Sequence, residues 1–220
     1  MRMPCMELLP LLFLTLVPAV SASSLSLEYA ARPKDLDNRV KKVLDSDRWG
    51  RGGMNVPAVD GQTLHDIILE NKYTRALEIG TSTGHSAIWI AWALSKTGGK
   101  LVTIEIDEGR RREALRNFEE AGLSEFVDAR LGDAHEIVPA LEGPFDFVFS
   151  DADKDWNKNY LIAVLPKLEV GGCYTTHNVS RKGEHSGTRE YLDYLLGVSN
   201  LETTFDDRGA GLSISYKKPG

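Results

Sequence analysis

The chain has 220 residues, a net charge of −6 at pH 7, and 42% hydrophobic and 26% charged residues. This length and composition are typical of one soluble α/β domain with a substantial core, and they argue against two domains. The negative net charge argues against a surface that neutralises many phosphates, so no nucleic-acid partner is expected. The basic run Arg110-Arg111-Arg112 lies between Glu108 and Glu113 and is interpreted as a solvated helix face.

The first 22 residues differ from the rest. Arg2 precedes an apolar run over residues 8–20, and Val20-Ser21-Ala22 fits the small-residue rule for signal-peptide cleavage. We therefore expect a signal peptide or anchor at 1–22 and one domain at 23–220. Three interpretations stay open: a cleaved signal of an exported (periplasmic or secreted) protein, an uncleaved anchor with membrane association, or a misassigned start codon of a cytoplasmic protein. The apolar run is short for a membrane span, and cleavage would leave Cys173 without a disulfide partner.

Alternating apolar runs and amphipathic stretches predict the remaining elements. In chain order we expect helices at 35–46 and 60–71, a strand at 75–80, a helix at 84–96, a strand at 100–105, a helix at 108–121, a strand at 126–131, a helix at 134–141, a strand at 145–150, a helix at 156–167, a strand at 171–176, a helix at 187–196, and strands at 201–206 and 211–217.

Continuous apolar strands between amphipathic helices indicate a parallel sheet that is covered on both faces. The last two strands are expected to pair antiparallel at one edge. The predicted fold is therefore α/β: a Rossmann-like, doubly wound, mostly parallel seven-stranded sheet with an antiparallel edge strand, in a single domain.

The segment "RALEIGTSTGHS" leads from a strand through Gly80 and Gly84 into a helix. Ligands of open α/β sheets bind beyond the carboxyl ends of strands, where glycines let backbone amides approach them. The spacing lacks the six-residue dinucleotide fingerprint, so a tight turn without a ligand is the alternative. Glu105 ends the next strand, 25 residues beyond Gly80, where an acid can accept both ribose hydroxyls of an adenosine.

These residues resemble the cation-dependent catechol and caffeoyl-coenzyme A O-methyltransferases, which are S-adenosylmethionine enzymes. That family carries E-I-G-x-x-x-G-Y-S, an acid at the end of the second strand, and D-A-D-K at the end of the fourth; this chain has "EIGTSTGHS", Glu105 and "DADK". The tyrosine of the first motif is His85 here, and "GGMNV" at 52–56 is similar to the family's segment that closes over the cofactor. The resemblance implies these contacts to S-adenosylmethionine: Val56, Glu78, Gly80, Ser86, Glu105, Ala134 and Asp151.

Asp151 ends the fourth strand, and a carboxylate there can hold a divalent cation, with Lys154 as the general base for a catechol hydroxyl. His177 and Asn178 end the next strand, where the family has Asp-Asn. The expected metal ligands are Asp151, His177 and Asn178. Because an imidazole replaces a hard oxygen, they favour Mn²⁺ or another first-row metal over Mg²⁺. The alternative is that the metal is lost and His177 serves as a base or hydrogen-bond partner.

The sequence thus predicts an S-adenosylmethionine-dependent O-methyltransferase that acts, with a divalent metal, on a small aromatic diol. Trp49 and Trp156 are candidates for an aromatic slot around that substrate, with plain packing as the alternative. Three other functions stay open: a metal-independent methyltransferase, a tRNA-modifying methyltransferase, and a cofactor-binding protein without catalysis. Whether the protein is a monomer or a homodimer is also left open.

Overall fold

The computed structural model describes residues 34–50, 55–179 and 186–220. The elements below belong to one compact unit, Leu36–Gly220. The expected signal or anchor at 1–22, and residues 52–54 of the "GGMNV" segment, lie outside the described residues. Within the described ranges, no helix is long and apolar enough to cross a bilayer.

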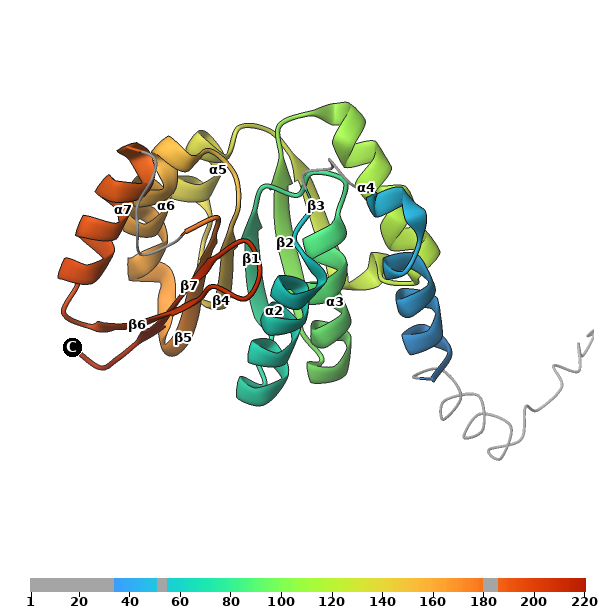
Figure 1. The fold of residues 1–220 in the computed structure, drawn as a ribbon, viewed down its shortest axis with the longest axis horizontal. Coiled ribbons are helices and arrows are strands. Elements are labelled where there is room, and N and C mark those ends of the chain that lie inside the picture. Colours follow the sequence, from blue (N-terminus) through green and yellow to red (C-terminus); the bar gives the residue numbers. More distant parts are fainter. Residues whose placement is uncertain (1–33, 51–54, 180–185) are drawn as a thin grey trace, which may run out of the picture. The chain divides into compact units, whose positions relative to one another are not determined.

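A seven-stranded sheet with the order β3-β2-β1-β4-β5-β7-β6 forms the centre of the unit (Figure 1). Strands β1 to β5 are parallel, and β7 runs antiparallel to both β5 and β6. The predicted antiparallel pairing of the last two strands is confirmed. The strands are β1 Arg75–Ile79, β2 Lys100–Glu105, β3 Val127–Leu131, β4 Phe145–Ser150, β5 Leu168–His177, β6 Leu201–Asp206 and β7 Leu212–Lys217.

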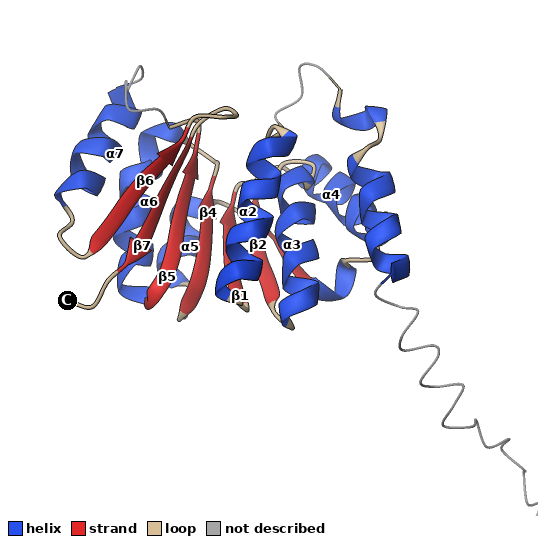
Figure 2. Cartoon of the chain, turned by 60° about the horizontal axis from the view of Figure 1, so that its bottom comes forward, coloured by secondary structure: helices blue, strands red, loops and turns tan. Residues whose placement is uncertain are grey.

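Helices cover both faces of the sheet (Figure 2). The α-helices are α2 Ala58–Asn71, α3 His85–Thr97, α4 Glu108–Ala121, α5 Ala134–Ala140, α6 Asn157–Val164 and α7 Ser186–Gly197, after a first helix whose described part is 34–44. Short 3₁₀ turns are η1 Asp47–Trp49, η2 Ser124–Phe126, η3 Lys154–Trp156 and η4 Leu165–Lys167.

Successive side chains of each strand point to opposite faces of the sheet, so a hydrophobic core forms on each face. Phe147 and Phe149 of β4 point into the core under α2, α3 and α4. Val148, between them, points into the core under α5, α6 and α7. All three side chains are fully buried, which is why β4 reads as a continuous apolar run in the sequence.

Two predicted elements differ from the structure. The helix expected at 156–167 is three shorter pieces, η3, α6 and η4, and Pro166 lies at the start of the last one, where it has no N–H to continue an α-helical ladder. Strand β5 begins three residues earlier than expected. Its pairing with β4 shifts from Phe145↔Leu168 to Phe147↔Cys173. Gly171 and Gly172, which resemble a turn in the sequence, therefore lie in a bulge of this strand.

The strand order reverses between β1 and β4, because the chain winds outward from this pair in both directions. In doubly wound sheets, such a switch point leaves a crevice at the carboxyl ends of the strands. Backbone hydrogen bonds fix the crevice here. Gly80 and Thr81 donate to the Ile104 carbonyl at 3.1 and 3.0 Å, and Asp151 donates to the Ile79 carbonyl at 2.9 Å.

Candidate active site

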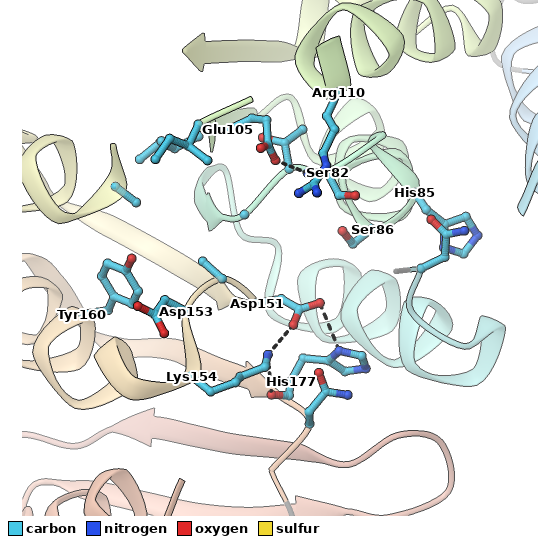
Figure 3. Close-up of a pocket in the computed structure, with 18 of the residues that line it drawn as sticks. Ser82, His85, Ser86, Glu105, Arg110, Asp151, Asp153, Lys154, Tyr160 and His177 are labelled. Atoms are coloured by element: carbon cyan, nitrogen blue, oxygen red, sulfur yellow. Dashed lines mark hydrogen bonds and ion pairs between the residues drawn. The ribbon is translucent and has the colours of Figure 1, made fainter. Parts of the chain in front are cut away.

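A cavity of about 630 Å³ lies at this switch point (Figure 3). Its walls come from the ends of the five parallel strands and from the segments that follow them, with further residues before α2 and in the loop between β6 and β7. Five of the seven predicted cofactor contacts line it: Gly80, Ser86, Glu105, Ala134 and Asp151. Glu78 and Val56 are buried and are not among the lining residues, although Asn55 and Pro57, on either side of Val56, are.

The glycine turn after β1 forms one wall of the cavity. Gly80 has a φ of +99°, and a Cβ there would lie 2.5 Å from the Asp151 carbonyl oxygen. Only glycine therefore allows β1 to turn this close to the end of β4. The turn leads into α3, whose first residues, His85 and Ser86, also line the cavity.

Glu105 holds this turn from the neighbouring strand. Its Oε2 accepts a hydrogen bond from the Ser82 amide at 2.7 Å, and its Oε1 accepts one from the Asp107 amide at 2.9 Å. Each oxygen keeps a second lone pair, and the side chain lines the cavity. The carboxylate is thus positioned both to shape the loop and to accept hydrogen bonds from a bound ligand.

Glu78 lies behind the turn and is fully buried. Ser86 Oγ donates to its Oε1 at 2.6 Å, and Thr103 Oγ1 donates to its Oε2. Burial raises the pKa of Glu78 to about 8, although these hydrogen bonds act in the opposite direction. The carboxyl group is therefore largely neutral at pH 7 in the free protein, and its ionised form is favoured by a cation bound nearby.

The polar residues at the ends of β4 and β5 form a connected network. Asp151 Oδ1 accepts a hydrogen bond from Lys154 Nζ at 2.6 Å, and Asp151 Oδ2 lies 3.0 Å from His177 Nδ1. Lys154 also donates to the His177 carbonyl at 3.3 Å. On the far side of the ring, His177 Nε2 lies 3.0 Å from Asp60 Oδ2, on helix α2. Figure 3 shows the Lys154, Asp151 and His177 part of this chain at the cavity wall.

The two central groups of the network have shifted pKa values. Burial would raise the pKa of Asp151, but the His177 hydrogen bond and the Lys154 charge outweigh it and lower that pKa. Burial would lower the pKa of His177, but the hydrogen bonds and charge of Asp151, with the hydrogen bond to Asp60, raise it. Both shifts favour a carboxylate beside an imidazolium.

The predicted metal ligands Asp151, His177 and Asn178 do meet at this wall, but they do not fit a divalent cation in this arrangement. Each ring nitrogen of His177 lies 3.0 Å from a carboxylate oxygen, one of Asp151 and one of Asp60, and a ring that donates to both has no lone pair left for a metal ion. Asn178 is exposed, with a φ of +57°.

The candidate aromatic residues Trp49 and Trp156 each pack on a histidine that lines the cavity. Trp49 packs on His85 with ring centroids 4.7 Å apart and donates from Nε1 to the Val43 carbonyl at 2.7 Å. Burial lowers the pKa of His85 to about 4. Trp156 stacks on His135 at 3.7 Å, with ring planes 14° apart. Neither tryptophan itself lines the cavity.

Asp60, which contacts His177 in the polar network, is a residue that the sequence did not predict. In the sequence it is only an acidic residue at the start of a predicted helix, where acids favour the helix dipole. It lies 117 positions from His177. No spacing rule connects residues so far apart, so only the tertiary structure could identify the pair.

Comparison with known proteins identifies the family of the chain. A family model described as O-methyltransferase matches residues 31–193. The catechol O-methyltransferase of Niastella koreensis is 40% identical over 139 residues, which cover 61% of this chain and 62% of that protein. The catechol O-methyltransferase of Mycobacterium tuberculosis is 37% identical, covering half of each chain. The chain therefore spans less than two thirds of the length of these two relatives.

Longer matches come from a plant relative and from solved structures. Caffeoyl-CoA O-methyltransferase 1 of Eucalyptus globulus is 33% identical over 189 residues, covering 79% of this chain and 76% of that protein. The O-methyltransferase TomG of Streptomyces achromogenes, solved with SAM, has a TM-score of 0.72 and 29% identity, covering 82% of this chain and 90% of the other. An O-methyltransferase from Bacillus cereus, solved with SAH, has a TM-score of 0.72 and 27% identity, covering 82% and 91%. The motifs, the sheet order and these matches together show that the chain belongs to the O-methyltransferase family.

Proposed function

We propose that this protein is an S-adenosylmethionine-dependent O-methyltransferase that methylates one hydroxyl of a small catechol-type aromatic. The observation that carries the proposal is the meeting, in one cavity, of the Gly80 turn, the Glu105 carboxylate and the Asp151–Lys154 pair. Relatives named for catechol methylation, and a relative solved with SAM, support the choice of substrate and cofactor.

In this proposal the cofactor lies along the glycine turn. Glu105 accepts hydrogen bonds from the ribose hydroxyls. Glu78, behind Ser86, ionises when the cationic cofactor binds, because the bound charge offsets the cost of a buried carboxylate. The walls hold the sulfonium and the substrate oxygen in line, and positioning of this kind is the main contribution to rate.

Lys154 handles the substrate proton. As the general base it accepts the phenol proton while the oxygen takes the methyl group and the sulfonium becomes a thioether. The positive charge thus passes from sulfur to the Lys154 ammonium, and Asp151 is placed to hold it at 2.6 Å. No step is assigned to a divalent cation, because a His177 ring that donates to both Asp151 and Asp60 has no lone pair for one.

Calorimetry with S-adenosylmethionine, followed by a methyl-transfer assay, tests the proposal. The assay compares catechol and a caffeoyl ester with resorcinol, whose hydroxyls are not adjacent, each with added Mn²⁺, added Mg²⁺ or a chelator. We expect cofactor binding and turnover on the adjacent diols. Cofactor binding without turnover on any diol would favour a binding protein without catalysis, and absence of cofactor binding would refute the proposal.

A further inference from the structure

Asp60 is a buried carboxylate for which the proposed reaction has no role so far. It lies in the first turn of α2 and is fully buried. Its Oδ2 accepts a hydrogen bond from the Ala210 amide at 2.9 Å and lies 3.0 Å from His177 Nε2. Its Oδ1 is buried and has no hydrogen-bond partner. Burying a carboxylate in this way is costly unless a cation is close to it, and His177 lies at the required distance.

The loop between β6 and β7 is shaped around Asp60. A Cβ on Gly209 would lie 1.9 Å from Asp60 Oδ1, so any side chain there would displace the carboxylate. Glycine at 209 and the amide of Ala210 together leave a space that this carboxylate fills. The position of Asp60 is therefore fixed from the loop side as well as from α2.

The hydrogen-bond count around His177 determines the charge of its ring. Each ring nitrogen lies 3.0 Å from a carboxylate oxygen, one of Asp151 and one of Asp60. Ionised carboxylates only accept hydrogen bonds, so both ring nitrogens must donate, and such a ring is a cation. Asp60, His177 and Asp151 then form a row of alternating charges.

We propose that Asp60 is a positioning residue which holds His177 as a cation against Asp151, and that this Asp60–His177 pair replaces a divalent metal ion in the site. The inference rests on the proposed function. It predicts that methyl transfer does not need a metal, since a fixed positive charge already lies beside Asp151. A divalent ion would have to displace the proton between His177 and Asp151.

The same geometry predicts that residues 60 and 177 are coupled. An aspartate at 177 would face the Asp60 carboxylate without a cation between them, and two like charges so close are unfavourable. His177→Asp should therefore be destabilising alone and tolerated when combined with Asp60→Asn. In the double variant a carboxylate faces Asp151 with no imidazolium between them, which is an arrangement that suits a divalent cation.

The first experiment uses the unmodified protein and needs no variant. Turnover on catechol is measured in a chelator and then with added Mn²⁺, and calorimetry measures Mn²⁺ binding without substrate. We expect full turnover in the chelator and no Mn²⁺ binding in the micromolar range. Loss of turnover in the chelator, with recovery on adding Mn²⁺, would overturn the inference.

The second experiment tests Asp60 itself with the variants Asp60→Asn, His177→Asp and their combination. We expect Asp60→Asn to lower kcat by about 10- to 100-fold, the effect of losing a buried hydrogen bond to a charged group. The KM for the cofactor should stay unchanged. Glu70→Gln, on the exposed side of the same helix, is the matched control and should behave like the unmodified protein. A kcat for Asp60→Asn equal to that of this control would refute the positioning role.

Unfolding measurements separate this inference from the proposed function. A double-mutant cycle on unfolding free energy measures the 60–177 coupling whether or not the protein methylates a catechol. If no diol is methylated under any condition, the proposed function fails, and the coupling and the Mn²⁺ titration of the double variant still test the pair. Additive effects of the two substitutions on unfolding, with no Mn²⁺ binding by the double variant, would exclude the coupling.

Discussion

Substituting Gly80 by alanine tests how closely the cofactor turn approaches the end of β4. Gly80 has a φ of +99°, and an added Cβ would lie 2.5 Å from the carbonyl oxygen of Asp151 and 2.9 Å from its carbonyl carbon. Real Cβ contacts are longer than this, so either the turn or the Asp151 backbone must move. Both belong to the candidate site, and we expect stability and cofactor binding to decrease together.

Gly98 is a matched control that isolates the conformational part of the cost. It follows α3 with a φ of +78°, and no heavy atom lies within 4 Å of an added Cβ. Gly98→Ala should cost about 1 kcal/mol, the usual penalty for an alanine in the left-handed region. Gly80→Ala carries at least the same penalty plus about 2 kcal/mol for overpacking, which gives a total of about 3 kcal/mol.

Thermal unfolding measures the difference. About 2–4 °C of Tm corresponds to 1 kcal/mol in a domain of this size, so we expect losses of about 3 °C for Gly98→Ala and about 9 °C for Gly80→Ala. Calorimetry should show weaker cofactor binding for Gly80→Ala alone. If the two variants lose the same Tm and bind cofactor equally well, the close approach of the turn to Asp151 is not a constraint on this fold.

Three further predictions concern the acidic residues of the site. Burial raises the pKa of Glu78 from its ordinary 4.5 to about 8, so its contribution to stability is complete below pH 4.5 and is lost as the pH rises through about 8. Glu78→Gln should flatten the decline in unfolding free energy between these two pH values. An unchanged slope would contradict the buried neutral form. Under the proposed function, Glu105→Gln should weaken cofactor binding by about tenfold or more, since it removes a carboxylate that accepts hydrogen bonds from loop amides and would accept them from ribose hydroxyls. Calorimetry beside the exposed control Glu169→Gln measures this, and equal affinities would exclude the role. Asp151→Ala should abolish turnover while circular dichroism shows an intact fold, because the backbone hydrogen bond to Ile79 remains; an active variant would remove Asp151 from the mechanism.

Local patterns were enough to predict the fold. Each strand except β5 lies within a residue of its expected bounds, because apolar runs and turn residues are encoded next to each other in the chain. The departures occur where a local pattern was ambiguous. Pro166 divides a helical pattern, and Gly171 and Gly172 form a bulge within a strand although they look like a turn.

The candidate site was predictable only in part. Gly80, Glu105 and Asp151 follow predicted strands, and the carboxyl ends of parallel strands meet at one edge, so their convergence could be expected. What could not be foreseen is the arrangement of partners within the site. Whether His177 binds a metal or a hydrogen-bond partner depends on Asp60, which reaches it from a helix far away in the chain.

The acids around the cavity also bear on how a reaction cycle would end. Four acids, Glu105, Asp133, Asp151 and Asp153, line the cavity together with fewer cationic side chains, Arg110, Lys154 and the His177 ring, and Glu78 lies just behind it. Under the proposed function the methyl donor arrives with a positively charged sulfur and leaves as an uncharged thioether. Surroundings rich in carboxylates attract the cationic donor more strongly than the uncharged thioether product. The same electrostatic field would therefore favour binding of the donor and release of the product.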